Sequence, residues 1–158
     1  MSKFNLDRVY ANFQQMKRVL PVKLANASVN YFTGTFKAEA FDGKDWQEVQ
    51  RRIPGTKPYR YPKTRDLGRR TRNILIGKGS GRLRRAVQGA LKVATWQQVK
   101  LVVDGSAFPY AKRHNEGLDN MPKRTFMADA KQLQKKQIEI INKEIRSEER
   151  RVGKECRL

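Results

Sequence analysis

Apolar residues recur at three- and four-residue intervals through the first part of the chain, from Asn5 to about Phe32. This spacing places them on one face of a helix, and such a face is usually buried in a core. Asn5 can cap the start of the helix, because its side-chain oxygen can accept from a free backbone N–H. Pro21 leaves two alternatives open: a kink within one helix, or the start of a second helix. The predicted stripe consists of Leu6, Val9, Tyr10, Phe13, Met16, Leu20, Val22, Ala25, Val29 and Phe32.

Turn signals and a long polar segment follow this helix. Asp42-Gly43 predicts a tight turn, and Trp46 is expected to anchor the start of the segment after it. Residues 51–73 contain three prolines and nine Lys or Arg side chains, without an apolar period. We therefore predict a long basic loop, and loops of this length in a compact domain are usually functional or mobile.

Three short strands are predicted in the next part of the chain. Residues 73–76 form an apolar run that is ended by glycines. Residues 83–94 and 97–104 are predicted as a hairpin joined at Thr95-Trp96, because apolar side chains alternate with polar ones in the second of them. A helix over 82–91 remains an alternative, since Leu83, Val87 and Ala90 also have helical spacing.

The last part of the chain returns to a helical pattern. A helical turn is predicted at 110–115, and an amphipathic helix from Phe126 onward, with Asp129 near its start. Its apolar stripe is Phe126, Ala130, Leu133, Ile138, Ile141 and Ile145. The elements together predict an α+β fold in one domain over 1–145, with a long N-terminal helix, a small antiparallel sheet, a C-terminal amphipathic helix and a long basic loop.

Composition adds a strong and uneven positive charge to this picture. The 158 residues carry a formal charge of +20, and residues 51–100 hold 15 basic side chains against one acidic one. This stretch must face an anion or solvent, because buried unpaired charge is costly. Nucleic acid is one such anion; a solvated basic loop is the equally weighted alternative.

The sequence offers little to catalytic or metal chemistry. The chain has one cysteine and one histidine, which argues against a disulfide framework or a zinc site. The glycines at 77, 79 and 81 lack the spacing of a dinucleotide-binding or phosphate-binding loop. His114 has no nucleophile at a recognisable spacing, so a structural or interface role is favoured. We expect no enzyme, no cofactor and no metal site.

Membrane and secretion signals are also not evident. No apolar run approaches the ~18 residues of a membrane span, and the first residues do not resemble a signal peptide. We therefore expect a cytosol-like compartment. Tyr59, Tyr61 and Trp96 could stack on bases, but no nucleic-acid-binding signature is present. Any contact with nucleic acid would then run through phosphates and be independent of sequence.

Four segments, taken in order, resemble the bacteriophage virion morphogenesis (tail completion) family. They are Phe36…Phe41-Asp42-Gly43…Trp46, Ile74-Leu75-Ile76-Gly77…Gly81-Arg82-Leu83-Arg84-Arg85, Pro109-Tyr110-Ala111-Lys112-Arg113-His114-Asn115-Glu116-Gly117 and Met121-Pro122-Lys123-Arg124-Thr125-Phe126. The match covers about residues 5–145. Residues 146–158 lie beyond it; they resemble translated adapter sequence, and we predict them to be disordered and non-native.

The resemblance implies a non-enzymatic virion protein of the tail neck. Such a tail terminator forms a ring, commonly a hexamer, that ends the tail tube and joins it to the DNA-filled head. The implied partners are further copies of the chain, the tail tube, and neck or head-connector proteins, with non-specific contact to packaged DNA. The implied location is the virion, and the host cytoplasm during assembly. The alternative function is a small sequence-independent DNA-binding protein.

Two sets of candidate site residues follow. A loop context combined with aromatic and arginine side chains suggests subunit contacts at Tyr110, His114, Met121, Pro122, Arg124 and Phe126. For Tyr110 and Phe126, a role in closing the core under the loop is equally open. The residues predicted to face DNA or an acidic partner are Arg69, Arg70, Arg72, Lys78, Arg82, Arg84 and Arg85.

Overall fold

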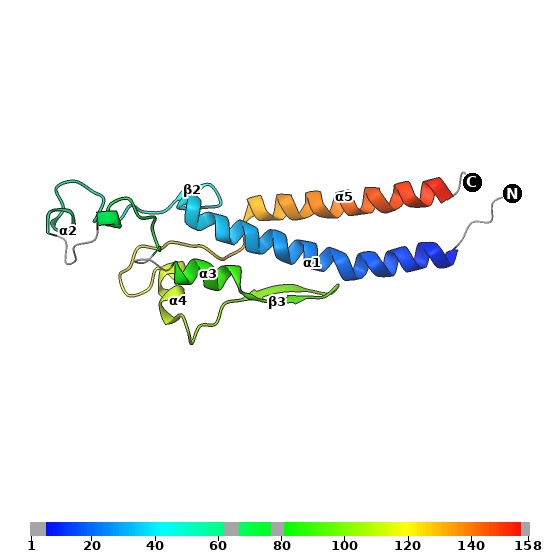
Figure 1. The fold of residues 1–158 in the computed structure, drawn as a ribbon, viewed down its shortest axis with the longest axis horizontal. Helices are drawn as coiled ribbons and strands as arrows, with labels where there is room; N and C mark the ends of the chain where they lie inside the picture. The colour runs from blue at the N-terminus through cyan, green and yellow to red at the C-terminus, as the bar shows by residue number, and fades with distance from the viewer. Residues whose placement is uncertain (1–5, 62–66, 77–80, 156–158) are drawn as a thin grey trace. The chain divides into compact units, whose positions relative to one another are not determined.

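The structure is a computed structural model and describes residues 6–61, 67–76 and 81–155. Its helices and strands confirm the predicted α+β class (Figure 1). Contacts within the chain divide it into two compact units. Unit 1 comprises 1–28, 91–102 and 131–158, and unit 2 comprises 29–90 and 103–130. The N-terminal helix α1 (Leu6–Ala38) contributes to both units.

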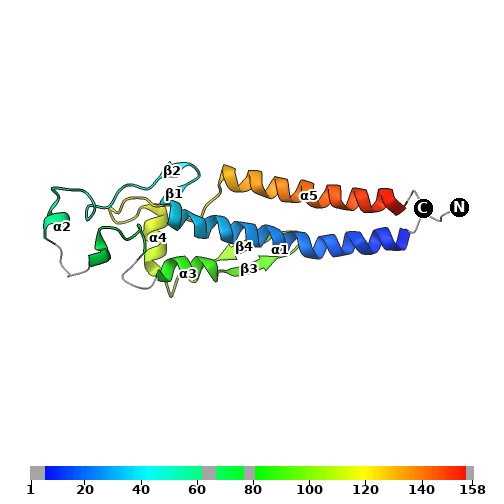
Figure 2. The same cartoon turned by 45° about the horizontal axis from the view of Figure 1, so that its top comes forward.

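Unit 1 combines the first part of α1 with a β-hairpin and the C-terminal helix α5 (Lys131–Glu155). Strands β3 (Leu91–Ala94) and β4 (Val99–Val102) pair antiparallel, and Thr95 N–H donates to the Gln98 carbonyl at the predicted connection. In this unit α5 runs antiparallel to α1 (Figures 1 and 2). Lys23 Nζ pairs with Glu144 Oε1 at 2.7 Å. A second link is Gln137 Nε2, which donates to Ser28 Oγ at 3.1 Å.

Unit 2 begins with the last turns of α1 and a short hairpin. Strands β1 (Ala40–Phe41) and β2 (Lys44–Asp45) pair antiparallel. Asp42 and Gly43 between them have φ values of +49° and +81°, so the predicted tight turn is confirmed. Positive φ at both central residues is the conformation for which Asp-Gly is favoured in two-residue hairpins.

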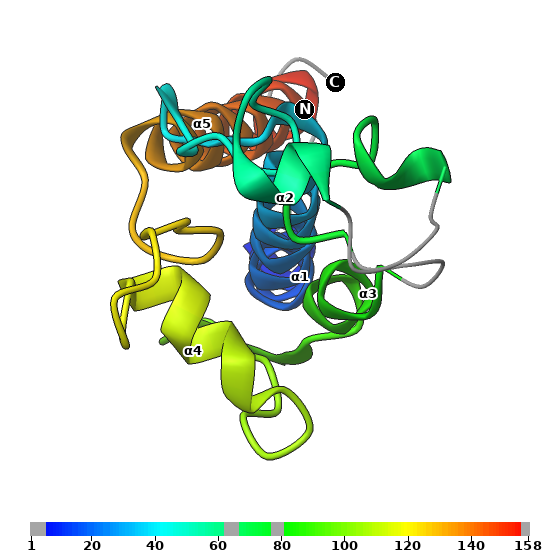
Figure 3. The ribbon, with the colours of Figure 1, turned by 90° about the vertical axis from the view of Figure 1, so that its left-hand side faces the viewer.

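Short helices make up the rest of unit 2. They are α2 (Lys57–Arg60), the 3-10 turn η1 (Leu67–Arg69), α3 (Arg82–Gln88) and α4 (Pro109–Glu116). In Figure 3, α3 lies to the lower right of α1 and α4 to its lower left. The core is aromatic: the Phe36 ring lies 5.8 Å from Trp46 and 5.3 Å from Phe126. Ile74, Leu83 and Val87 complete it, each at most 2% exposed.

The two alternatives left open by the sequence are resolved by these elements. α1 continues through Pro21 as one helix of 33 residues. Residues 82–88 are helical, so the strand predicted for 83–94 is wrong in its first half and right only from Leu91. Leu83 and Val87 explain the helix, because their four-residue spacing lets both side chains be buried together. Gly89 then follows the last helical residue.

Two further expectations are corrected. Residues 73–76 form a turn and not a strand: the Ile74 N–H donates to the Glu39 carboxylate, and Leu75 has a φ of +61°. The C-terminal helix begins at Lys131 and not near Phe126. Ile138 and Ile145, predicted on its buried face, are 56% and 42% exposed.

The C-terminal end of α5 also differs from the sequence expectation. Residues 146–155, for which we predict disorder, are helical in the structure. Within the described part of the chain, no helix is both long and apolar enough to cross a membrane.

Candidate functional site: a cationic cleft in unit 2

Asn115 joins two segments that carry the sequence resemblance. It lies near the end of α4, and its Oδ1 accepts from the N–H groups of Phe126 and Met127 at 2.9 and 3.1 Å. Its Nδ2 donates to the Met127 carbonyl at 2.9 Å. The N–H of Arg124 donates to the His114 carbonyl at 2.8 Å. Residues 124–127 are therefore fixed against the end of α4 by both backbone and side-chain bonds.

Gly117 allows this close approach. It ends α4 with a φ of +75°, a conformation that other residues rarely adopt. A Cβ at this position would lie 2.8 Å from Lys123 Cβ. Glycine is thus needed here for its backbone conformation and for space.

Trp46 connects the same segment to the β1–β2 hairpin, as its predicted anchoring role requires. The indole Nε1–H donates to the Thr125 carbonyl at 2.8 Å, and the residue is 7% exposed. Arg124 binds the residue after Trp46, because its Nε and Nη2 donate to the Gln47 carbonyl at 3.3 and 3.1 Å. The hairpin exit and the segment after α4 therefore form one body.

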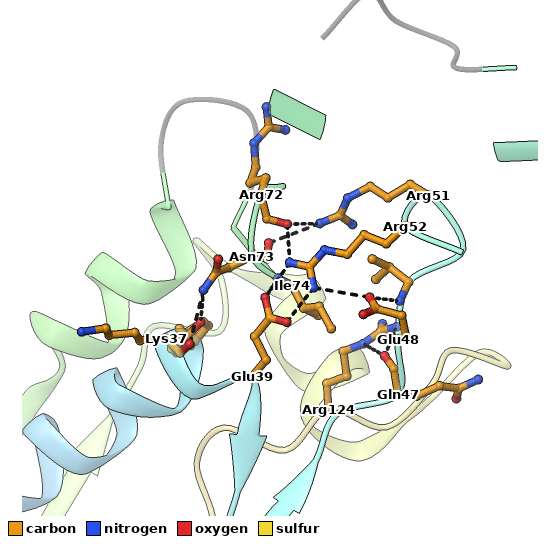
Figure 4. Close-up of polar contacts among 12 residues, drawn as sticks. Lys37, Glu39, Gln47, Glu48, Arg51, Arg52, Arg72, Asn73, Ile74 and Arg124 are labelled. Atoms are coloured by element: carbon orange, nitrogen blue, oxygen red, sulfur yellow. Dashed lines mark hydrogen bonds and ion pairs between the residues drawn. The ribbon is translucent and has the colours of Figure 1, made fainter. Parts of the chain in front are cut away.

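Glu39 organises the start of the basic loop (Figure 4). Its carboxylate accepts from Arg52 Nη1 and Nη2, both at 2.7 Å, and from the Ile74 N–H at 2.8 Å. These hydrogen bonds, led by those from Arg52, lower the pKa of Glu39, and the same pairing raises the pKa of Arg52. Glu39 has a φ of +55° directly after the last residue of α1.

Hydrogen bonds from Arg51 and from the side-chain amide of Asn73 also fix the conformation of the basic loop. Arg51 donates from Nε to the Arg69 carbonyl at 2.9 Å and from Nη2 to the Arg72 carbonyl at 2.9 Å. Burial lowers the pKa of Arg51, and repulsion from Arg52 and Arg72 lowers it further. Asn73 Nδ2 donates to the Phe36 carbonyl in the last turn of α1 at 3.2 Å. Arg51 and Arg52 therefore form hydrogen bonds within the protein and do not simply face solvent.

A cleft of about 350 Å³ lies beside this network. Its apolar lining consists of Val49, Ile74, Leu75, Ile76 and Leu83. Its polar lining consists of Arg51, Arg82, Tyr110, His114 and Arg124. Within the described residues no acidic side chain lines it. The cleft therefore offers three cations and two further hydrogen-bonding side chains above an apolar surface.

His114 and Arg124 are the most buried polar members of the lining. Arg124 is 6% exposed, and burial lowers its pKa. His114 Nδ1 is buried and has no hydrogen-bond partner among the residues that the structure describes. Burial, followed by the charge of Arg124, lowers the pKa of His114. Both effects favour the neutral imidazole over the charged one.

The predicted subunit-contact residues divide into exposed and buried members. Tyr110 is 40% exposed, Met121 and Pro122 are half-buried, and His114 lines the cleft. Phe126, 3% exposed, is a correction to that set, because its side chain lies in the core of unit 2, whereas Arg124, 6% exposed, is buried and lines the cleft. For Phe126 the core alternative is the right one, since its ring packs on Phe36.

The predicted anion-facing residues are placed mostly at the surface. Arg70, Arg82, Arg84 and Arg85 are exposed, whereas Arg69 and Arg72 are half-buried. Arg82, Arg84 and Arg85 lie on helix α3, in agreement with the helical alternative for 82–91. Lys78 lies outside the described residues.

Sequence reasoning missed Glu39, Arg51, Arg52 and Asn115 as organising residues. Asn115 alone had a signal, since it lies within a segment of the resemblance. In the described parts of the chain, no group of three or more His, Cys, Asp or Glu side chains is placed to hold a metal ion. No family model, no curated protein and no solved structure matches this chain.

Proposed function

We propose that the protein is a structural subunit of a bacteriophage neck, acting in tail completion and head–tail joining as part of a homo-oligomeric ring. The observation that supports this is the convergence of the four segments that carry the resemblance. Trp46 bonds Thr125, Asn115 bonds Phe126, and Ile74 and Leu83 share the cleft with α4 residues. Segments that meet in one body are more informative together than as separate short matches.

In this proposal the ring closes by a heterologous contact, in which one face of each subunit meets a different face of the next. Tyr110 and Met121 are the remaining aromatic and apolar candidates with accessible surface. Aromatic side chains at interface centres often contribute 2 kcal/mol or more of binding energy, roughly a 30-fold change in affinity.

The test is the mass of the purified protein, measured by light scattering and by negative-stain microscopy, alone and with phage tail tubes added. We expect rings, and we expect Tyr110→Ser and Met121→Ser to reduce ring formation at micromolar protein. Tyr61→Ser is the matched control, because Tyr61 is 72% exposed and lies outside the proposed contact. A protein that stays monomeric both alone and with tail tubes would contradict the proposal.

The DNA-binding alternative has its own supporting observation. Arg84 and Arg85 are exposed neighbours on α3. In the basic loop, Arg70 lies 4.0 Å from the Tyr59 ring centroid, which presents a cation next to an aromatic face. This function predicts a monomer or dimer whose affinity for duplex DNA falls steeply with salt. Replacing Arg84 by Gln should reduce the salt slope by about 1, and an affinity that does not change with salt would exclude this function.

A further inference from the structure

We propose that the unit 2 cleft is a binding site for a carboxylate carried on an apolar group of a protein partner, such as a chain end or an acidic side chain next to a leucine. The inference rests on the cleft alone and does not depend on the proposed ring or on a phage context. Three features of the cleft support it. Its charged lining residues are all positive, its buried Arg124 has few hydrogen-bond acceptors, and its remaining lining is mainly apolar.

The buried cation is Arg124. A guanidinium has five N–H donors, and among the described residues this one has a single acceptor, the Gln47 carbonyl, at 3.1 and 3.3 Å. The acidic residue that influences it, Glu48, forms its ion pair with Arg52 instead. A buried cation without a carboxylate is costly unless a partner arrives. Arg124 is therefore prepared for an anion that enters the cleft.

The other polar side chains that line the cleft also favour an anionic ligand. Arg51 and Arg82 add two positive charges, and Tyr110 adds a hydroxyl donor. The buried Nδ1 of His114 is without a partner in the described part of the chain, and a neutral imidazole can donate from either nitrogen. Because the lining has cations and donors without an acid, it disfavours cationic ligands and favours an anionic acceptor.

The apolar lining and the volume of the cleft indicate which chemical group bears the bound carboxylate. Ile74 and Leu83, each 2% exposed, form part of the floor beneath these donors. A volume of about 350 Å³ is at the small end of ligand pockets. It suits a group of roughly one amino-acid residue: a carboxylate with an apolar side chain beside it.

Nucleic acid fits the cleft less well. Phosphates of a duplex are bound mainly by accessible Lys and Arg side chains and by backbone N–H groups. Arg124 is 6% exposed, and a phosphodiester has no apolar part to cover the floor. The protein partner is therefore the occupant that we adopt, and DNA becomes an outcome of the test.

The experiment is an NMR titration of the full chain, following the Nε–Hε signals of Arg51, Arg82 and Arg124. The probes are N-acetyl-leucine, the acetylated and amidated dipeptide Leu-Asp, neutral N-acetyl-leucinamide, inorganic phosphate and a short DNA duplex. We expect one or both acids to bind at least about tenfold more tightly than the neutral amide, as loss of a charged hydrogen bond implies. Comparing the two acids distinguishes a chain end from an acidic side chain.

Two variants on the same helix provide a matched control. Arg82→Gln should weaken binding of the acid about threefold, and Arg84→Gln should leave it unchanged, because only Arg82 lines the cleft. Arg124→Gln should weaken it tenfold or more. If Arg124→Gln does not fold, the comparison of Arg82 with Arg84 decides the question.

Several results would overturn the proposal. Equal binding of N-acetyl-leucinamide would show that charge is irrelevant, and equal binding of phosphate would show that the apolar floor is irrelevant. An equal effect of Arg84→Gln would indicate general surface attraction. A duplex that shifts the three signals at lower concentration than either acid would assign the cleft to nucleic acid.

Discussion

Replacing Glu39 by alanine should destabilise unit 2 more than any substitution of an exposed loop charge. The carboxylate accepts three hydrogen bonds, two from Arg52 and one from the Ile74 N–H. Alanine would leave that N–H without an acceptor at a residue that is 2% exposed. It would also remove the shorter of the two ion pairs of Arg52, at 2.7 Å, and leave the pair with Glu48 at 3.4 Å.

The magnitude follows from these contacts. An unsatisfied buried donor costs about 1–3 kcal/mol. The Glu39 and Arg52 side chains are 21% and 17% exposed, so their pair is only partly screened, and we expect it to contribute about 1–2 kcal/mol. Glu39→Ala should therefore lower the free energy of unfolding by about 3 kcal/mol in total. Glu39→Gly should lose about 1 kcal/mol less, because glycine adopts the observed φ of +55° without strain.

The assay is urea denaturation followed by circular dichroism at pH 7 and low salt, with Arg52→Ala and the double variant completing a thermodynamic cycle. We expect a coupling of about 1–2 kcal/mol between Glu39 and Arg52. Arg60→Ala is the control, because it removes an exposed arginine from the same loop and should cost less than about 0.5 kcal/mol. A coupling below about 0.5 kcal/mol would refute the reasoning.

Acid should reduce the difference between wild type and Glu39→Ala. Hydrogen bonds from Arg52 lower the pKa of Glu39 in the folded protein, so the folded state binds fewer protons than the unfolded state. Its contribution is present above the unfolded pKa and is lost as the pH falls through the folded pKa. If the difference in free energy of unfolding between wild type and Glu39→Ala stays constant down to low pH, the lowered pKa of Glu39 is contradicted.

Three other predictions concern the region around α4. Asn115→Asp should cost about 1–2 kcal/mol in urea denaturation, because a carboxylate replaces the donor to the Met127 carbonyl; an unchanged midpoint would contradict the bond. Trp46→Phe should lower the melting temperature by about 3–6 °C through loss of its bond to Thr125, and a change below 1 °C would contradict the anchoring role. Because burial lowers the pKa of His114, the folded state binds fewer protons, and stability should fall as the pH drops from about 6.5 toward the folded pKa. In His114→Gln this part of the pH dependence should vanish, and melting curves with the same pH slope as wild type would contradict it.

The fold was most predictable where local geometry determines it. Helical spacing predicted α1, and Asp42-Gly43 predicted the first hairpin turn, because each depends on adjacent residues. Periodicity failed at the start and face of α5, and also in the first half of the α1 stripe, where Leu6, Tyr10 and Phe13 are exposed. Phe126 fits the spacing but packs on Phe36, and Ile138 fits the stripe but is exposed. Spacing describes which residues share a face, and tertiary packing decides whether that face is covered.

The site was less predictable, because its parts come from distant segments. The charge count located the cationic residues but did not separate outward-facing arginines from those with internal partners. Arg51 donates to carbonyls about 20 residues away, and Arg124 donates to a carbonyl 77 residues away. No local pattern specifies such partners. That no acidic side chain lies among the described residues lining the cleft is likewise a property of the folded chain alone.

The division of the chain into units has a consequence for its synthesis. All segments of unit 2 lie before residue 131, whereas unit 1 needs α5, the last described helix. At ribosomal rates of 5–20 residues per second, the 25 residues of α5 take about 1–5 s to appear. During that interval the hydrogen bonds of Glu39 to Arg52 and Ile74 can already form, while the first part of α1 still lacks its helical partner. Unit 1 is then completed last, so substitutions in α5 should affect the yield of folded protein more than they affect the cleft, whose residues all belong to unit 2.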